Sequence, residues 1–215
     1  EQTGVEAEHI TLQPLASSEA VLSYEEKELG VVLVDIGGGT TDIAVWKDGS
    51  LIHSQIIPIG GNHFTNDLAV ALKIPHNEAE RVKIKIGSAL EVNDPKEMEV
   101  RGRDVGAGMP KSIVIDSNDI AKAVERPLRS IIKSIQSVLE KTPPELSADI
   151  IDRGMVMSGG TAMLRNLDRL FTKATGVPSH VADDPAFCVA KGTGIALELL
   201  AAGDRKFSFN REFRR

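Results

Sequence analysis

The sequence has a single cysteine, Cys188, among its 215 residues. One cysteine cannot form an internal disulfide, and neither Cys188 nor the five histidines show the spacing of a zinc site. The chain must therefore be stabilised by packing alone. A reducing, cytoplasmic compartment is the expected location, because disulfides are rare there.

Long apolar runs are also missing, and none approaches the roughly 20 residues that a membrane-spanning helix needs. No signal peptide is visible. The formal net charge of −6 argues against a general nucleic-acid binder. Hydrophobic residues (41%) and charged residues (26%) are balanced as in an ordinary globular protein. Because the chain begins at Glu1 without methionine, we interpret it as a fragment of a longer chain or an engineered piece.

The last twelve residues differ from the rest. The segment 204–215, DRKFSFNREFRR, has five basic and two acidic residues and three phenylalanines. Two interpretations of this segment are open. It makes a weak amphipathic contact with a membrane or a partner, or it is an added tail or an edge strand in which Phe207 and Phe209 alternate. Twelve residues are too few to anchor a protein firmly to a membrane.

Hydrophobic periodicity predicts a layered α/β protein. Predicted strands cover 29–35, 42–46, 51–58, 97–101, 112–115 and 154–158. Predicted helices cover 14–22, a segment carrying Phe64, Leu68 and Leu72, a segment capped by Asn77, a long stretch from Ser117 that Pro127 kinks or divides, a face with Met163, Leu164, Leu167 and Leu170, and 185–201. The segment 88–116 has the pattern of a small inserted subdomain.

Three consecutive glycines, Gly37, Gly38 and Gly39, stand between two predicted strands in the segment VDIGGGTTD. A tight hairpin that demands positive φ explains one or two of them. Backbone N–H groups that converge on a phosphate chain explain all three, with hydroxyl donors from Thr40 and Thr41. Asp35 precedes the glycines and can hold Mg²⁺ directly or through water. No Gly-Lys-Ser/Thr follows, so this is not a Walker loop.

Two further features are weaker. The segment Ser158-Gly159-Gly160-Thr161-Ala162 leads from a strand into a helix, which suits a ligand contact or, alternatively, close helix–strand packing. Glu80 and Lys83 stand three apart on one predicted helix and by themselves indicate a solvated ion pair.

Together these motifs resemble the actin-like ATPase superfamily, with DIGGGTTD similar to its second phosphate loop and MSGGTAMLRN to its adenosine loop. Residues 10–72 resemble the FtsA family of division proteins. Residues 98–128 and 143–198 resemble the MreB family of shape-determining filaments. A chimera, an inferred ancestor and an unusual natural relative all remain open.

The resemblance implies a ribonuclease-H-like α/β core (1–87 and 117–203), a small inserted α+β subdomain (88–116, or 76–122 with its flanking helices) and a tail (204–215). It also implies ATP or ADP with Mg²⁺ as ligands. By position, the phosphate contacts would be Gly37, Gly38, Gly39, Thr40 and Thr41, the metal residue Asp35, and the nucleoside contacts Glu80, Lys83, Gly159, Gly160, Thr161 and Ala162. Gln13 would position the attacking water, so any hydrolysis would depend on Gln13, Asp35 and Thr41.

Proteins of this superfamily have two lobes, and the first phosphate loop of the other lobe has no counterpart here. One hypothesis is therefore a nucleotide-binding lobe with weak or absent hydrolysis. A second is self-association, as a homodimer or filament, in which two copies rebuild the cleft through apolar helix faces at 15–22 and 188–199 that would otherwise be exposed. A third is a non-catalytic scaffold of cell division or cell shape.

Overall fold

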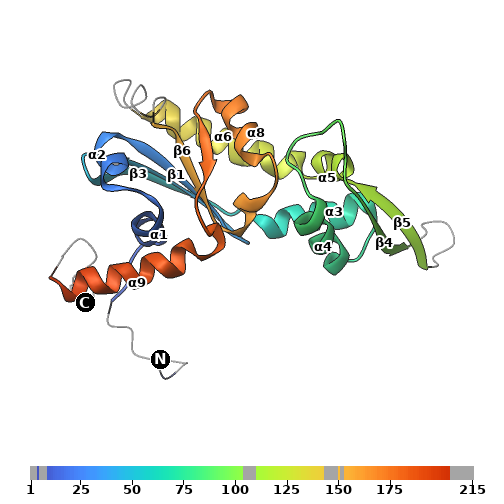
Figure 1. The fold of residues 1–215 in the computed structure, drawn as a ribbon, viewed down its shortest axis with the longest axis horizontal. Coiled ribbons are helices and arrows are strands. Elements are labelled where there is room, and N and C mark those ends of the chain that lie inside the picture. The colour runs from blue at the N-terminus through green and yellow to red at the C-terminus, as the bar shows by residue number, and fades with distance from the viewer. Residues whose placement is uncertain (1–3, 5–8, 104–109, 143–149, 151–152, 204–215) are drawn as a thin grey trace.

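The computed structural model describes residue 4 and residues 9–103, 110–142, 150 and 153–203 (Figure 1). The predictions made for 204–215, including the alternation of Phe207 and Phe209, lie outside the described residues. Within the described part, no helix is long and apolar enough to cross a membrane.

A five-stranded mixed sheet forms the centre of the molecule, in the order β3-β2-β1-β6-β7. Its strands are β1 (Val31–Ile36), β2 (Thr41–Lys47), β3 (Ser50–Ile57), β6 (Met155–Ser158) and β7 (Ser179–Val181). β1, β2 and β3 form an antiparallel meander, whereas β6 is parallel to both β1 and β7. The sheet agrees with the predicted α/β class, although β7 was not predicted and β1 begins two residues later than expected.

Helices cover both faces of this sheet, which is why all six residues of β1 are buried. Val32, Val34 and Ile36 face one side, where they share a core with α6 (Glu125–Lys141) and α8 (Leu167–Thr175). Val31 and Leu33 face the other side, which is covered by α1 (Gln13–Val21) and α2 (Tyr24–Leu29). The strand period of two thus assigns alternate side chains to two hydrophobic layers.

The helix α9 (Cys188–Ala201) packs across α1 (Figure 1). Ala16 of α1 and Cys188 and Ala196 of α9 are all buried. The two helix faces that we expected to be exposed therefore cover one another in large part. Exposed apolar side chains remain nearby at Leu12 and Leu197.

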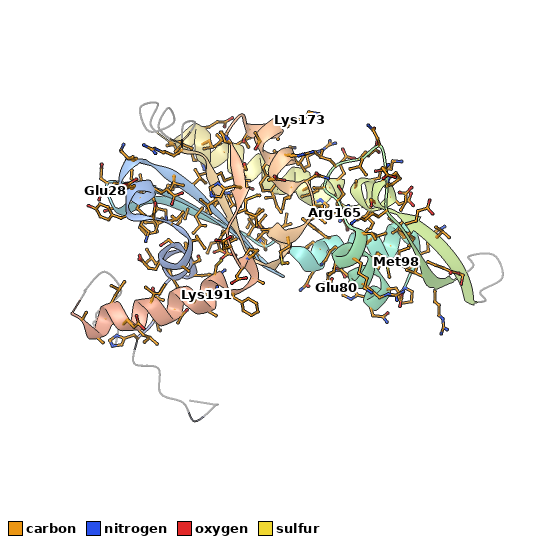
Figure 2. The ribbon with its side chains drawn as sticks, in the orientation of Figure 1. Glu28, Glu80, Met98, Arg165, Lys173 and Lys191 are labelled. Carbon is orange, nitrogen blue, oxygen red and sulfur yellow. The ribbon has the colours of Figure 1, made fainter. Side chains whose placement is uncertain are left out.

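A smaller sheet of two antiparallel strands, β4 (Glu97–Arg103) and β5 (Pro110–Asp116), lies at the other end of the molecule. The helices α3 (Gly61–Leu72), α4 (His76–Ile86) and α5 (Ser117–Ala123) lie beside it (Figure 1). In Figure 2, Glu80 and Met98 are at this end of the molecule, Glu28 is at the opposite end, and Lys191 lies between them.

Several element boundaries differ from the predictions. Asn77 does not cap α4, because the helix begins at His76 and its N-cap is Pro75. The long helical stretch is divided at Val124, and Pro127 is accommodated in the first turn of α6, where its missing N–H is harmless. The sequence pattern also missed α2, which starts with a capping box between Ser23 and Glu26.

The glycine-rich corner after β6 is also more irregular than predicted. A short 3₁₀ helix, η1 (Gly160–Met163), precedes α8, so Met163 and Leu164 do not belong to the face of α8. The last helix likewise begins with a 3₁₀ turn, η2 (Pro185–Phe187), before α9.

Candidate functional site

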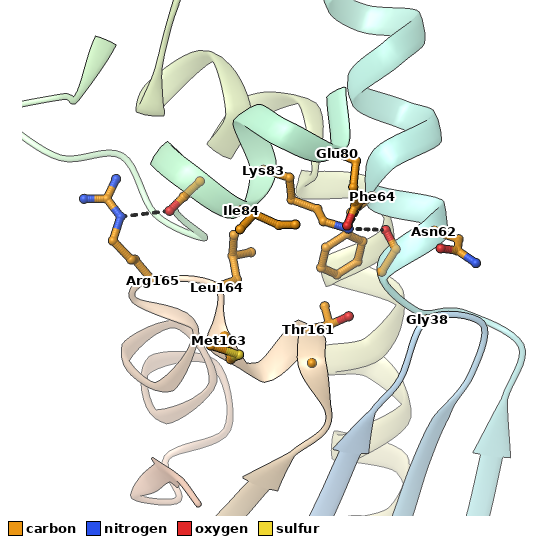
Figure 3. Close-up of a pocket in the computed structure, with 13 residues that line it drawn as sticks. Gly38, Asn62, Phe64, Glu80, Lys83, Ile84, Thr161, Met163, Leu164 and Arg165 are labelled. Atoms are coloured by element: carbon orange, nitrogen blue, oxygen red, sulfur yellow. Dashed lines mark hydrogen bonds and ion pairs between the residues drawn. The ribbon is translucent and has the colours of Figure 1, made fainter. Parts of the chain in front are cut away.

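A cavity of about 370 Å³ opens where the ends of β1 and β6 meet α3 and α4 (Figure 3). The 37–40 loop, α3, α4 and the η1 corner contribute to its wall. Its lining residues are Gly38, Gly61, Asn62, Phe64, Glu80, Lys83, Ile84, Gly87, Gly160, Thr161, Met163, Leu164 and Arg165. Segments far apart in the sequence therefore meet at one site.

The three glycines of the 37–40 loop do not need positive φ, because none of them adopts it. A Cβ atom on Gly38 would lie 3.7 Å from its nearest neighbour, the side chain of Asn62, and one on Gly39 would meet nothing within 4 Å. The hairpin explanation therefore fails for these residues, since neither backbone conformation nor contact with the protein requires glycine. Glycine at these two positions leaves the backbone accessible from outside.

The orientation of the loop is set by the N-terminus of α3. The N–H of Gly61 donates to the carbonyl of Gly37 (2.9 Å), and the N–H of Asn62 donates to the carbonyl of Gly38 (2.8 Å). In a planar trans peptide the C=O and the next N–H point in opposite directions. The N–H groups of Gly38 and Gly39 therefore point away from α3, and they donate to no other described residue. Such free, parallel donors suit an anion.

The hydroxyls of Thr40 and Thr41, which we expected to donate to a phosphate, donate to groups of the protein. Thr41 is fully buried, and its hydroxyl donates to the carbonyl of Ile59 (2.8 Å). Thr40 donates to a carboxylate oxygen of Asp42 (3.3 Å). Both hydroxyls thus bond within the protein, and Thr41 is not among the residues that line the cavity.

Asp35 lies at the end of β1 with only 2% of its surface exposed. The Nε2 of Gln13 donates to its Oδ2 (3.3 Å), so the structure brings this predicted pair together. Asp42 is opposite Asp35 in the β1–β2 ladder. Burial raises the pKa of Asp35, the Gln13 hydrogen bond opposes this, and the charge of Asp42 adds to it. Burial also raises the pKa of Asp42.

This pair of buried carboxyls is compatible with a divalent cation. The described residues contain no group of three or more His, Cys, Asp or Glu side chains that could hold a metal by themselves. A cation at Asp35 would therefore need water and phosphate oxygens as its other ligands, which is the preference of Mg²⁺. Its positive charge would also oppose the burial and the charge of Asp42, which together raise the pKa of Asp35.

Glu80 and Lys83 form part of the cavity rather than an isolated surface pair. Their side chains are 2.7 Å apart, and the ammonium of Lys83 also donates to the carbonyl of Gly61 (3.1 Å) and the hydroxyl of Thr65 (2.8 Å). Thr65 in turn contacts the carboxylate of Glu80. Burial acts to raise the pKa of Glu80, but the hydrogen bonds from Lys83 and Thr65 outweigh it and lower the pKa.

Within the 158–162 segment, the structure shows close packing at one glycine and open space at the next. Gly159 has φ +85°, and a Cβ atom there would lie 2.3 Å from the carbonyl oxygen of Ile36, so close packing requires this glycine. Gly160 lines the cavity and has open space at its Cα, as a ligand contact requires. Ala162 is buried, and the hydroxyl of Thr161 points to the 37–40 loop.

Several residues of the site were not predicted. Gly60 lies against the loop, since a Cβ atom on it would be 2.6 Å from the Gly37 carbonyl oxygen. Arg165 donates to the carbonyls of Gly87 (2.9 Å) and Ile86 (2.7 Å) at the end of α4. Adjacent glycines before a helix were a usable signal for Gly60. No local pattern indicates Arg165, because its partners are far away in the sequence.

The chain is similar in sequence to known proteins. The sequence model of the family described as MreB/Mbl protein matches residues 14–204. The chain is 41% identical over 196 residues to the cell shape-determining protein MreB of Escherichia coli strain K12, covering 87% of this chain and 56% of that protein. It is 42% identical over 175 residues to the cell shape-determining protein Mbl of Bacillus cereus, covering 79% and 53%.

Solved structures agree. The crystal structure of Spiroplasma citri MreB5 bound to ADP superposes with a TM-score of 0.87 at 31% identity, covering 95% of this chain and 64% of that chain. The MamK double helical filament, at 22% identity and a TM-score of 0.71, shares the fold. The predicted actin-like α/β fold is thus confirmed.

Two consequences follow for the expectations from sequence. The MreB/Mbl family match begins at residue 14 and so includes nearly all of the segment 10–72. The FtsA-like assignment of this segment is therefore not supported. The chain spans little more than half the length of the curated relatives it matches.

Proposed function

Because this chain belongs to the MreB/Mbl protein family, we propose that it is the nucleotide-binding half of an actin-like cytoskeletal protein that acts in cell shape. Its ligands would be ATP or ADP with Mg²⁺. The observation that carries the proposal is the pair of N–H groups at Gly38 and Gly39, which have no partner among the described residues and carry no side chain of their own that would keep a ligand away. MreB5 of Spiroplasma citri is bound to ADP in one crystal structure and to AMPPNP in another.

In this proposal the phosphate chain lies against the 37–40 loop, which α3 holds with its donors outward. Mg²⁺ would supply charge neutralisation at the phosphates. Asp35 would hold it, directly or through water, while Gln13 keeps the carboxylate in place and orients water near it. Thr41 would act by fixing the loop to Ile59 rather than by touching phosphate.

The nucleoside would occupy the wider part of the cavity. Ile84 and Met163 are exposed apolar side chains on opposite walls, and each suits the face of a base (Figure 3). Glu80 and Lys83 would border the ribose. The carboxylate of Glu80 offers acceptors to its hydroxyls, whereas the three donors of Lys83 already bond to Glu80, Gly61 and Thr65, so Lys83 would hold Glu80 in place. Gly160 would allow the ligand to approach the backbone closely.

Hydrolysis by this chain alone would be weak or absent. The loop offers donors on one side of a phosphate chain, whereas rapid phosphoryl transfer needs positioning and charge stabilisation from all sides.

Residues 88–116, with the flanking helices within 76–122, would form the small inserted subdomain. Residues 1–87 and 117–203 would form the core.

Thermal denaturation with and without Mg-ADP or Mg-ATP tests nucleotide binding. A ligand at 100 times its Kd stabilises a protein by about 2.7 kcal/mol. We expect Gly38→Ala to fold normally, because its Cβ has room, but to lose at least about tenfold in affinity, or about 1.4 kcal/mol. Gly194→Ala on α9 is the matched control, since its Cβ has room as well and meets no atom closer than 4 Å. No stabilisation of the wild type at millimolar nucleotide would instead favour a non-catalytic scaffold.

Self-association is a second component of the proposal. Leu12, Phe187 and Leu197 are 47%, 63% and 58% exposed on or beside α1 and α9. A second copy of this chain, packed α9 against α9, would cover them and place two phosphate loops around one nucleotide.

The mass of the protein in solution, measured with and without Mg-ATP, tests this pairing. Leu197→Lys should reduce the dimer fraction at equal protein concentration. Val70→Lys, at another exposed apolar position (79%) on α3, should leave the fraction unchanged. A monomer under both conditions would contradict self-association and leave the nucleotide proposal standing.

A further inference from the structure

Thr161 connects the two loops that form the cavity. Its Oγ1 donates a hydrogen bond of 2.9 Å to the carbonyl oxygen of Gly37, which is 124 positions earlier in the sequence. The same oxygen accepts the N–H of Gly61 at 2.9 Å. Both lone pairs of the Gly37 carbonyl are therefore used, one from α3 and one from the η1 corner. Figure 3 shows Thr161 between the η1 corner and the loop that carries Gly38.

We propose that Thr161 is a positioning residue for the phosphate-binding loop, and that it acts through the Gly37 carbonyl instead of contacting the nucleoside. The inference rests on the proposed nucleotide-binding function and deepens it. It replaces the role over adenine and ribose that the family resemblance implies for this position.

The peptide plane between Gly37 and Gly38 links Thr161, on its carbonyl side, to the proposed phosphate site, on its N–H side. The carbonyl on one edge of this plane is held by Thr161 and Gly61, and the N–H of Gly38 on the other edge points away from both. Glycine has the widest backbone freedom of any residue, so a plane between two glycines rotates easily unless its carbonyl is held. Two donors on that carbonyl therefore preorganise the N–H of Gly38 before an anion arrives.

The surrounding packing keeps the Thr161 hydroxyl in place. A Cβ atom on Gly61 would lie 2.5 Å from Thr161 Oγ1, so any side chain at Gly61 would displace the hydroxyl. Thr161 itself is half-buried. The hydroxyl thus fits into the space that the missing side chain of Gly61 leaves, within reach of the Gly37 carbonyl.

Comparing ligands with and without phosphate separates the two possible roles. The dissociation constants of ADP, inorganic pyrophosphate and adenosine would be measured for the wild type, Thr161→Val and Thr161→Ser. Thr161→Ala provides a second variant without the hydroxyl. Thr193→Val is the matched control, because the Thr193 hydroxyl also donates to a backbone carbonyl, that of Val189 (2.7 Å), but on the exposed side of α9.

We expect Thr161→Val and Thr161→Ala to weaken ADP and pyrophosphate about three- to tenfold, as the loss of one hydrogen bond predicts. Adenosine should change less than about twofold, since it makes no use of the loop. Thr161→Ser should bind all three as the wild type does, and Thr193→Val should do the same.

Equal weakening of ADP and adenosine would overturn the inference, because it would show that Thr161 touches the nucleoside. Unchanged binding of all three ligands would overturn it as well. A wild type that binds neither ADP nor pyrophosphate would refute the proposed function itself, and the inference with it. The two failures are therefore distinguishable.

Discussion

The backbone of Gly192 in α9 is in direct contact with the backbone of Ala16 in α1. A Cβ atom on Gly192 would lie only 1.7 Å from the Ala16 carbonyl oxygen and 2.4 Å from its carbonyl carbon. Two helices far apart in the sequence thus approach as closely as a glycine permits. This contact holds α9 against the core beside Gln13 and Asp35.

Gly192→Ala should destabilise the protein by about 1–3 kcal/mol, because α1 and α9 must move apart to accept the methyl group. Gly194→Ala, two residues further along α9, should instead stabilise it by about 0.5–1 kcal/mol, because its Cβ has room and alanine favours helix. Chemical denaturation of the three proteins measures both changes. Destabilisation of equal size in both variants would contradict the observed packing.

Gly60→Ala should disrupt the phosphate loop. The new Cβ would lie 2.6 Å from the Gly37 carbonyl oxygen and 2.8 Å from that of Gly38, so the loop must shift from α3. We expect a loss of about 1–3 kcal/mol in stability and of at least about tenfold in ADP affinity. Gly160→Ala is the control for stability, since nothing lies within 4 Å of its Cβ. ADP titration and denaturation together report the two effects, and wild-type affinity in Gly60→Ala would argue against a role for this contact.

Thr65→Val should loosen the Glu80–Lys83 pair. The buried hydroxyl accepts from Lys83 and contacts Glu80, so valine of similar shape removes both interactions. The expected destabilisation is about 1–2 kcal/mol, and Thr65→Ser should restore most of it. If valine and serine variants unfold at the same denaturant concentration as the wild type, the hydroxyl does not hold this pair.

Asp35→Asn should make the ligand-free protein more stable at neutral pH. Burial raises the pKa of Asp35 in the folded state, so folded protein binds more protons than unfolded protein between the ordinary and the raised pKa. Stability therefore falls as pH rises through that window, and asparagine removes the effect. The gain should disappear below about pH 4, where the carboxyl is protonated in both states.

Thermal denaturation across this pH range checks the Asp35 prediction. Asp94→Asn, which removes an exposed carboxyl, is the matched control. The same Asp35→Asn variant should lose the part of ADP binding that depends on Mg²⁺. A variant less stable than the wild type at neutral pH would mean that the charge of Asp35 is compensated in the ligand-free protein.

Much of the fold could be predicted because it follows from local patterns in the sequence. The apolar run of β1 and the apolar stripe of α6 each indicate the period of a regular element. The errors occurred where local signals are weak. The three-residue strand β7 and the six-residue α2 are too short for a period, and the corner between η1 and α8 depends on Gly159 packing against Ile36.

The sequence by itself determined that three adjacent glycines must serve something other than a regular element, and it indicated Asp35 and the 158–162 segment as companions. Gln13 was added by the family resemblance. Only the tertiary structure decided how they are used. The N-terminus of α3 turns the loop amides outward, Thr41 bonds inside the sheet, and Thr161 holds the Gly37 carbonyl. The physical reason is that residue type and spacing restrict a local backbone, whereas the direction of a hydrogen bond between residues 124 positions apart depends on how whole elements pack.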